Sequence, residues 1–344
     1  FAAEGGTLRL DEDAVQDIQC LGGTILGTAN RGNPFRMVLR DEQGRPLRDD
    51  NGQVKTRDRS AEAVERLKAM GIDGVISIGG DGTLSMAQEF YEAHGVPIVG
   101  VPKTIDFDLS GTEATFGFKT AVQVACDALD RLRTTADSHD RVLILELMGR
   151  YAGWIALHAG IAGGAHAVLL PELPYDPRSV WERVTQRFRR QRKFSLVVIA
   201  EGARPRGGDY AISEERLHPA ALPVLGGAGV RLRQELEQLT QEEQSRANAE
   251  GERIHEAPEI RVVVLGHIQR GGTPLAEDRV IASACGSHAV DMLVAGHVGH
   301  MAAWRFDGPT HVPLDVATVP NIIDPDNEPL VTVAREMGIC LGDS

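Results

Sequence analysis

Residues 75–108 read VISIGGDGTLSMAQEFYEAHGVPIVGVPKTIDFD, and this stretch decides the fold. Residues 75–78 form a short apolar run that predicts a buried strand, and a glycine-rich turn follows at once. A helix is expected at about 83–93, and a second apolar run at 97–101 predicts the next strand. A strand, a helix and a strand in this order predict a parallel pair joined by a crossover helix.

The same alternation continues toward the C-terminus. Phe118, Val122, Ala125, Leu129 and Leu132 recur at spacings of four and three residues, which predicts an amphipathic helix. Further strands are expected at 141–147, 167–170, 194–200 and 261–265, and further helices at 60–70, 151–162 and 177–191. This pattern is typical of an α/β fold with mainly parallel sheets, and we expect two α/β lobes.

The composition is that of an ordinary globular protein. Of the 344 residues, 42% are hydrophobic and 25% are charged, and the length suggests about two domains. The formal net charge of −13 argues against nucleic acid as a partner. No membrane partner is expected, because no apolar run approaches the roughly 20 residues that span a bilayer. Four scattered cysteines without a C-x-x-C pair favour a reducing cytoplasm over a disulfide framework or a zinc site.

The glycine-rich turn carries one acidic residue. Gly79, Gly80, Asp81, Gly82 and Thr83 lie between a predicted strand and a predicted helix. Glycines let backbone N–H groups approach phosphate oxygens, and a helix N-terminus adds partial positive charge. Asp81 has the wrong sign for a phosphate but suits a Mg²⁺ ion that bridges phosphates. A plain strand-to-helix turn is the alternative, and a carboxylate among glycines favours the phosphate and metal site.

The loop at 102–108 also follows a predicted strand, so it lies beside the first loop in a parallel sheet. Asp106 and Asp108, with Lys103 and Thr104, offer a general base, a second charge and a phosphate ligand. An Asx turn with a surface lysine is the structural alternative.

Three more polar positions follow predicted strands. The tripeptide at 148–150 could place an arginine fork on a phosphate, or could be a helix-start turn with a solvated arginine. His267 and Arg270 lie beside glycines, which suits a bound phosphate monoester, although a lone histidine is more often structural. Glu201 could accept hydrogen bonds from sugar hydroxyls, or could be solvated.

Taken in chain order, seven motifs resemble those of the 6-phosphofructokinase family. They are GGTILGT (22–28), IGGDGT (78–83), PKTIDFD (102–108), SHDRV (138–142), MGR (148–150), AEG (200–202) and LGHIQRGG (265–272). The likeness runs from about residue 5 to the C-terminus and implies two three-layer α/β lobes with mainly parallel sheets and the active site in the cleft between them. It implies that residues 1–117 plus 269–319 form the donor-binding lobe. Residues 118–268 plus 320–344 would form the fructose 6-phosphate-binding lobe.

The resemblance also implies an activity. In this family a phosphoryl group passes from ATP or pyrophosphate, with Mg²⁺, to the 1-hydroxyl of fructose 6-phosphate, a step of glycolysis in the cytoplasm. It implies a homotetramer or homodimer whose active site is shared between subunits.

Carried over residue by residue, the resemblance assigns three groups. Against the donor it places Arg31, Gly80, Asp81, Gly82, Thr83 and Lys103, with Asp81 serving the Mg²⁺. Catalysis falls to Thr104, Asp106, Asp108 and Arg150, with Asp106 as the general base. Fructose 6-phosphate would meet Thr104, Asp106, Arg141, Met148, Gly149, Arg150, Glu201, Arg261, His267 and Arg270. Of these, Arg141 and Arg261 match arginines that reach the 6-phosphate from a neighbouring subunit.

Two positions bear on the donor. Gly82 leaves room for ATP where pyrophosphate-using members commonly carry Asp, whereas Lys103 matches a lysine typical of pyrophosphate users. The combination resembles the mixed branch of the family, and steric room favours ATP over pyrophosphate.

Two departures from the family pattern stand out. The opening strand and the G-G-x-x-P-G-x-N loop of the family are absent from this sequence, so we expect either a longer natural chain or a poor catalyst. Phe107 stands where the family has Asn, and we expect it to alter loop packing. A non-catalytic sugar-phosphate-binding regulatory subunit and a lipid or NAD kinase are the competing interpretations.

Overall fold

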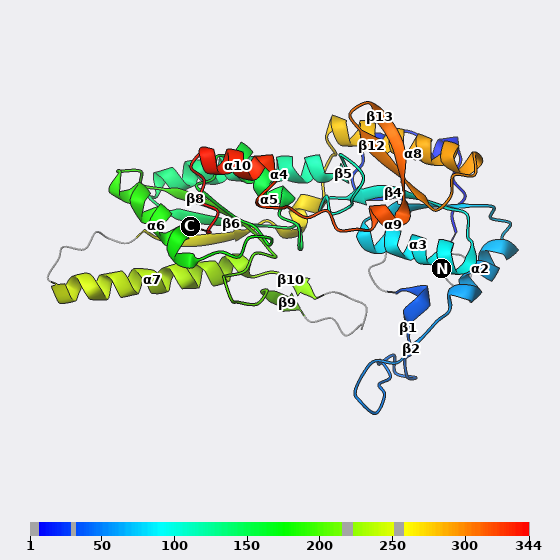
Figure 1. Ribbon diagram of the computed structural model, residues 1–344, viewed down its shortest axis with the longest axis horizontal. Coiled ribbons are helices and arrows are strands. Elements are labelled where there is room, and N and C mark those ends of the chain that lie inside the picture. Colours follow the sequence, from blue (N-terminus) through cyan, green and yellow to red (C-terminus); the bar gives the residue numbers. More distant parts are fainter. Residues whose placement is uncertain (1–6, 29–31, 215–222, 251–257, 344) are drawn as a thin grey trace.

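The computed structural model describes residues 7–28, 32–214, 223–250 and 258–343. Two separate sheets organise these residues, and they lie toward opposite ends of the long axis of the molecule (Figure 1). β4 and β12 belong to one sheet, and β6 and β8 belong to the other (Figure 1). The predicted pair of α/β lobes is confirmed.

The first sheet has the strand order β13-β12-β4-β3, with β5 pairing β4. Its strands are β3 (Val75–Gly79), β4 (Ile98–Thr104), β5 (Phe116–Gly117), β12 (His300–Arg305) and β13 (Gly308–Pro313). β3, β5 and β12 run parallel to β4, and β13 is antiparallel to β12. The mainly parallel sheet is therefore as predicted. β3 is half-buried rather than buried, with Ile78 44% exposed, because β3 is an edge strand in the described part of the chain.

Helices cover both faces of the first sheet. They are α3 (Asp81–His94) and α9 (Leu314–Ala317) on one face and α8 (Ala276–Val294) on the other. Leu84 of α3 and Met301 of β12 belong to one buried apolar cluster, whereas Ile281 of α8 belongs to another with Val99 and Val101 of β4. These contacts make a three-layer lobe, and α3 is the predicted crossover helix.

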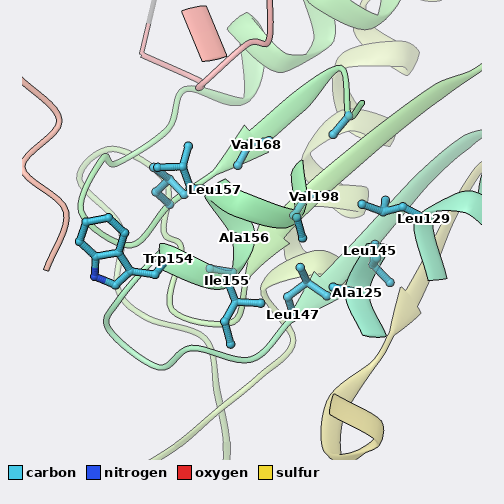
Figure 2. Close-up of a cluster of buried hydrophobic side chains, with 14 of the residues drawn as sticks. Ala125, Leu129, Leu145, Leu147, Trp154, Ile155, Ala156, Leu157, Val168 and Val198 are labelled. Atoms are coloured by element: carbon cyan, nitrogen blue, oxygen red, sulfur yellow. The ribbon is translucent and has the colours of Figure 1, made fainter. Parts of the chain in front are cut away.

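The second sheet is wholly parallel, in the order β11-β6-β8-β7. Its strands are β6 (Val142–Leu147), β7 (Ala167–Leu169), β8 (Ser195–Ala200) and β11 (Ile260–Val264). One face is covered by α4 (Phe118–Ser138), α5 (Trp154–Ala162) and α10 (Pro329–Glu336), and the other by α6 (Pro177–Arg189) and α7 (Ala228–Glu250). Successive β6 side chains alternate between the two faces, so Leu145 and Leu147 lie on the side of α4 and α5 (Figure 2) while Ile144 packs on the α6 and α7 side.

Smaller elements lie outside the two sheets. They are α1 (Glu12–Val15), η1 (Ile18–Cys20), η2 (Pro34–Arg36), β1 (Met37–Val38), β2 (Thr56–Arg57), α2 (Ser60–Ala69), β9 (Ile212–Glu214) and β10 (Val224–Leu225). β1 and β2 pair antiparallel and frame a polar ribbon that projects from the body (Figure 1). Among the described residues, no helix is both long and apolar enough to cross a membrane.

The N-terminus of α4 is capped from the other lobe. Gly117 precedes this helix and offers no side chain, and the buried carboxylate of Asp278 on α8 accepts hydrogen bonds from the backbone N–H and hydroxyl of Thr120. A helix of the first lobe is thereby tied to a helix of the second.

Acid is expected to destabilise the protein through His166. Its Nδ1 accepts the backbone N–H of Leu196 at 2.9 Å, and burial, with the positive charges of Arg187 and Arg133, lowers the pKa of His166 to about 3. Because this folded-state pKa lies below the unfolded value of about 6.5, the unfolded chain binds more protons between these two pH values. The contribution of His166 to the free energy of unfolding is therefore complete above pH 6.5. It falls toward pH 3 by up to about 1.4 kcal/mol per pH unit.

Urea unfolding at pH 7 and pH 5 measures this loss. His166→Asn, whose carbonyl oxygen can still accept the Leu196 N–H, should show a shallower pH dependence by about 1–2 kcal/mol over this interval. Equal losses in the two proteins would contradict the assignment to His166.

Candidate active site

The site starts where β4 ends. β4 continues to Thr104, beyond the predicted strand end at 101, because Lys103 and Thr104 pair with the short strand β5. Thr104 and Asp106 are both buried, and the Thr104 hydroxyl accepts the backbone N–H of Asp106 at 3.1 Å. The same hydroxyl donates to Oδ1 of Asp108 at 3.3 Å. Thr104 therefore fixes the loop that presents both aspartates.

The two aspartates hold their protons more tightly than usual. Burial raises the pKa of Asp106, and the nearby charges of Arg270 and Arg150 oppose this shift. Burial, with the charges of Asp106 and Asp81, raises the pKa of Asp108 to about 7. Oδ1 of Asp106 is buried and has no hydrogen-bond partner among the described residues. A buried carboxylate with a free oxygen between arginines is suited to accept a proton.

The glycine-rich turn faces the same loop. Gly80 precedes α3 and Asp81 is the first residue of that helix. A Cβ atom added to Gly80 would lie 3.3 Å from Cβ of Thr104, so only a glycine backbone comes this close to β4 without crowding. A Cβ atom on Gly82 would meet no atom within 4 Å, so the space beside Gly82 is open. The predicted phosphate turn and the predicted catalytic loop are brought together.

Residues 148–150 approach from the second lobe in a constrained conformation. Gly149 has φ 142° and Arg150 has φ 52°, both in the left-handed region that side chains avoid. The backbone N–H of Arg150 donates to Oε1 of Glu201 at 3.0 Å. Burial raises the pKa of Glu201, and the N–H of Arg150 opposes that shift. Because Arg150 also lowers the pKa of Asp106, its charge acts on the loop after β4 in the other lobe.

The turn η3 (Gly266–Arg270) follows β11 and completes the group. Arg270 lowers the pKa values of both Asp106 and Lys103, although burial is the main cause of the lowered pKa of Lys103. His267 and Arg270 are exposed, whereas Gln269 is buried and accepts the backbone N–H of Met148. Gln269 lies inside the motif at 265–272 but was not predicted as a site residue, because nothing in its spacing indicates that it links two loops.

Two predicted site residues lie away from this group, and a third lies outside the described residues. Arg141 immediately precedes β6 and Arg261 is the second residue of β11, whereas Met148 and His267 follow those strands. The two arginines therefore lie at the opposite end of the second sheet, where both pair with Glu259. Arg31 lies outside the described residues.

The carboxylates suit Mg²⁺ only together with a phosphate ligand. Asp81, Asp106 and Asp108 offer oxygen atoms, which this ion prefers. In the described part of the chain, no three acidic, histidine or cysteine side chains lie close enough to hold a metal ion by themselves. Mg²⁺ commonly binds through one or two carboxylates plus substrate phosphates, and that arrangement fits Asp81 at the turn.

Phe107 lies between the two aspartates and packs away from them. Its ring stacks on Phe118 at a centroid distance of 5.1 Å and meets the edge of Trp154 at 5.5 Å. Its φ of 55° is left-handed, and its carbonyl oxygen accepts Nδ2 of Asn321 at 2.8 Å. Phe107 therefore contributes packing, in agreement with the expected change in the loop.

Phe107→Asn is expected to leave the rate and the substrate affinity within about twofold of the wild-type values, because Thr104 still holds both aspartates. Asn tolerates the left-handed backbone, but the lost ring contacts should lower the free energy of unfolding by about 2 kcal/mol. Steady-state kinetics and urea unfolding measure the two effects. A large gain in rate would show instead that Phe107 impairs the loop.

The fold and this group of residues define a class: an α/β protein with a phosphoryl-transfer site formed from loops at the carboxyl ends of its parallel strands. The chain belongs to the phosphofructokinase family, whose model matches residues 3–293. The predicted family resemblance is confirmed.

Relatives that use either donor resemble this chain to a similar degree. The ATP-dependent 6-phosphofructokinase of Chloroflexus aurantiacus is 44% identical over 331 residues, covering 96% of this chain and 82% of that protein. The pyrophosphate–fructose 6-phosphate 1-phosphotransferase of Streptomyces coelicolor is 42% identical over 340 residues, covering 98% of this chain and 87% of that protein. Among solved structures, phosphofructokinase from Saccharomyces cerevisiae matches with a TM-score of 0.64 and 27% identity over 90% of this chain. This chain spans 38% of the length of that yeast chain.

Proposed function

We propose that the protein catalyses Mg²⁺-dependent transfer of a phosphoryl group from ATP to the 1-hydroxyl of fructose 6-phosphate, giving fructose 1,6-bisphosphate. One observation carries the proposal. The carboxylate of Asp106 is buried, and its Oδ1 has no hydrogen-bond partner in the described part of the chain. The charges of Arg150, Arg270 and Asp81 all act on this carboxylate. A proton acceptor, phosphate-binding cations and a Mg²⁺ ligand close to one another are what phosphoryl transfer requires, and this observation supports the proposal.

The roles follow from the chemistry of phosphoryl transfer. Asp106 takes the proton of the attacking 1-hydroxyl, and its raised pKa brings its basicity closer to neutral pH. Thr104 and Asp108 complete the loop around the transferred group. Arg150 offsets the negative charge that develops in the transition state.

The donor lies against the glycine turn. The backbone from Gly80 to Thr83, at the N-terminus of α3, receives the donor phosphates, and Asp81 would hold the Mg²⁺ that neutralises them. Arg31 is assigned to the nucleotide side from the family motif alone.

Fructose 6-phosphate lies on the side of the second lobe. Met148, Gly149 and Arg150 contact the sugar phosphate, Glu201 accepts hydrogen bonds from sugar hydroxyls, and His267 and Arg270 bind the phosphate. Residues 1–117 plus 269–319 would then form the donor lobe, and residues 118–268 plus 320–344 the sugar-phosphate lobe. The location of each sheet within one of these ranges supports this division.

The open space beside Gly82 supports ATP as the donor, because the remainder of a nucleotide needs room beyond its terminal phosphates. Pyrophosphate is the second candidate, because Lys103 adds a half-buried cation near Arg270. The third candidate is a regulatory subunit that binds sugar phosphate without turnover. The presence of Asp81, Asp106 and Arg150 argues against it, because a non-catalytic protein would not need all three.

An oligomer is proposed because two arginines are far from the site of their own chain. Arg141 and Arg261 would reach the 6-phosphate bound to a neighbouring subunit, in a homotetramer or a homodimer. A role in glycolysis would place the enzyme in the cytoplasm.

Initial rates with fructose 6-phosphate and Mg²⁺ test the proposal, with ATP and pyrophosphate compared at equal concentrations. Turnover with ATP is expected. Turnover with pyrophosphate alone would show that the positive charge of Lys103, and not the open space beside Gly82, determines the choice of donor. If the protein binds fructose 6-phosphate but transfers phosphate from neither donor, it is a regulatory subunit and not an enzyme.

A further inference from the structure

Gln269 joins two loops of the site by a side-chain hydrogen bond. It is 1% exposed, although His267 and Arg270 in the same turn are exposed. Its Oε1 accepts the backbone N–H of Met148 at 2.8 Å, across 121 residues of sequence. The turn η3 is therefore fixed directly to the first residue after β6.

This bond continues the second sheet beyond the point where its strands stop pairing. β6 and β11 stay in parallel register up to Glu146 and Val264, and the N–H of Leu265 then donates to the carbonyl of Glu146 at 3.1 Å. After Leu265 the chain turns into η3. The side chain of Gln269 then accepts the N–H of Met148, as a backbone carbonyl would in a longer strand.

The loop needs such support because its backbone is unfavourable. Arg150 adopts φ 52°, a left-handed conformation that is unfavourable for a non-glycine residue. On the β8 side, Glu201 accepts the N–H of Arg150 at 3.0 Å. Gln269 provides the matching acceptor on the β11 side, so the loop at 148–150 is held from both neighbouring strands.

We propose that Gln269 is a positioning residue that sets residues 148–150 relative to His267 and Arg270, so that both loops meet one sugar phosphate. The assignment of that ligand rests on the proposed function. Gln269 is too deeply buried to contact a substrate itself. Its Nε2 is also buried and has no hydrogen-bond partner among the described residues. Burial of this donor is unfavourable, and an apolar side chain of similar shape would avoid that free-energy cost. The acceptor oxygen is the property that only a polar side chain supplies.

The test compares Gln269→Met, which keeps the shape but loses the acceptor, with Gln269→Glu, which keeps an acceptor oxygen. In Gln269→Met, we expect the KM for fructose 6-phosphate to rise at least about tenfold while the KM for ATP stays within about twofold. Hydrogen exchange of the backbone amides at 148–150 should become at least about tenfold faster. Gln269→Glu should restore most of the amide protection and most of the sugar-phosphate affinity.

Val184→Ala is the control for a general loss of stability. Val184 is buried on α6, on the face of the second sheet away from α4 and α5, and its truncation should weaken the fold without changing either KM. The inference is overturned if Gln269→Met shows wild-type exchange at 148–150. It is also overturned if Val184→Ala raises the KM for fructose 6-phosphate equally at the same loss of stability. Failure of the wild-type protein to phosphorylate fructose 6-phosphate would refute the proposed function, whereas the amide exchange would still decide the positioning role.

Discussion

Asp106→Asn is expected to lower kcat by about 100- to 10,000-fold, the range attributed to a positioned general base. The carboxamide has nearly the shape of the carboxylate but cannot take the proton of the attacking hydroxyl. The KM for fructose 6-phosphate should change little, because Arg150, His267 and Arg270 remain. The fold should also be retained, because the substitution removes a carboxyl group whose burial is unfavourable and leaves the Thr104 contact with the backbone intact.

Initial rates at saturating fructose 6-phosphate and ATP measure this effect, together with urea unfolding of each variant. Asp127→Asn is the matched control, since Asp127 is an exposed carboxylate on α4 that accepts a hydrogen bond from the side-chain amide of Gln123 at 2.8 Å. It should keep wild-type kcat. An Asp106→Asn protein that retained more than about a tenth of kcat would show that another group accepts the proton.

Gly82→Asp is expected to lower kcat/KM for ATP by about 100-fold while pyrophosphate is affected much less. No atom lies within 4 Å of a Cβ atom built on Gly82, so the new side chain fits without moving the fold. Its carboxylate would stand beside Asp81 in the first turn of α3, where it occupies the space that a nucleotide, but not pyrophosphate, needs beyond the terminal phosphates. An acidic residue at a helix N-terminus does not weaken the helix, so the effect should fall on the donor.

Rates with each donor across a concentration series separate these effects. Gly286→Asp is the matched control, because Gly286 lies on α8 with no atom within 4 Å of a built Cβ atom and outside the site. It should leave both donors unchanged. Equal losses with ATP and pyrophosphate in Gly82→Asp would mean that the residue acts on the shared phosphates and does not select the donor.

The main elements of the fold were predictable because they are periodic. The apolar runs at 141–147 and 194–200 became β6 and β8, and the four-and-three spacing from Phe118 became α4. Strands of a parallel sheet are buried on both faces, so their sequences are nearly continuous apolar runs that stand out from the helices between them. Once the strands were located, the polar residues directly after each strand could be identified as candidates for the site.

Contacts between distant segments were not predictable in this way. β4 extends to Thr104 only because the two residues of β5, which have no strand pattern, pair with it. The cap that Asp278 provides to α4 and the bond from Gln269 to Met148 join residues more than a hundred positions apart. No local spacing encodes such pairs, because each depends on how separate elements pack together.

The burial of the loop at 102–108 was likewise not predictable from the sequence. The sequence offered an Asx turn as an alternative for 102–108, and the structure shows Asp106 buried and held through Thr104. The raised pKa values of Asp106 and Asp108 come from that burial and from charges in both lobes. A sequence lists the charged groups, but the distances that decide their pKa values belong to the folded chain.

The proposed activity joins a phosphoryl group to the 1-hydroxyl of fructose 6-phosphate. Phosphorus NMR of a mixture of the protein, Mg²⁺, ATP and fructose 6-phosphate tests it most directly, because it identifies the product as well as the donor. We predict signals of fructose 1,6-bisphosphate and ADP that grow in equal amounts, and that are lost with Asp106→Asn. Release of inorganic phosphate from ATP without a bisphosphate, or no change in either substrate, would contradict the proposed activity.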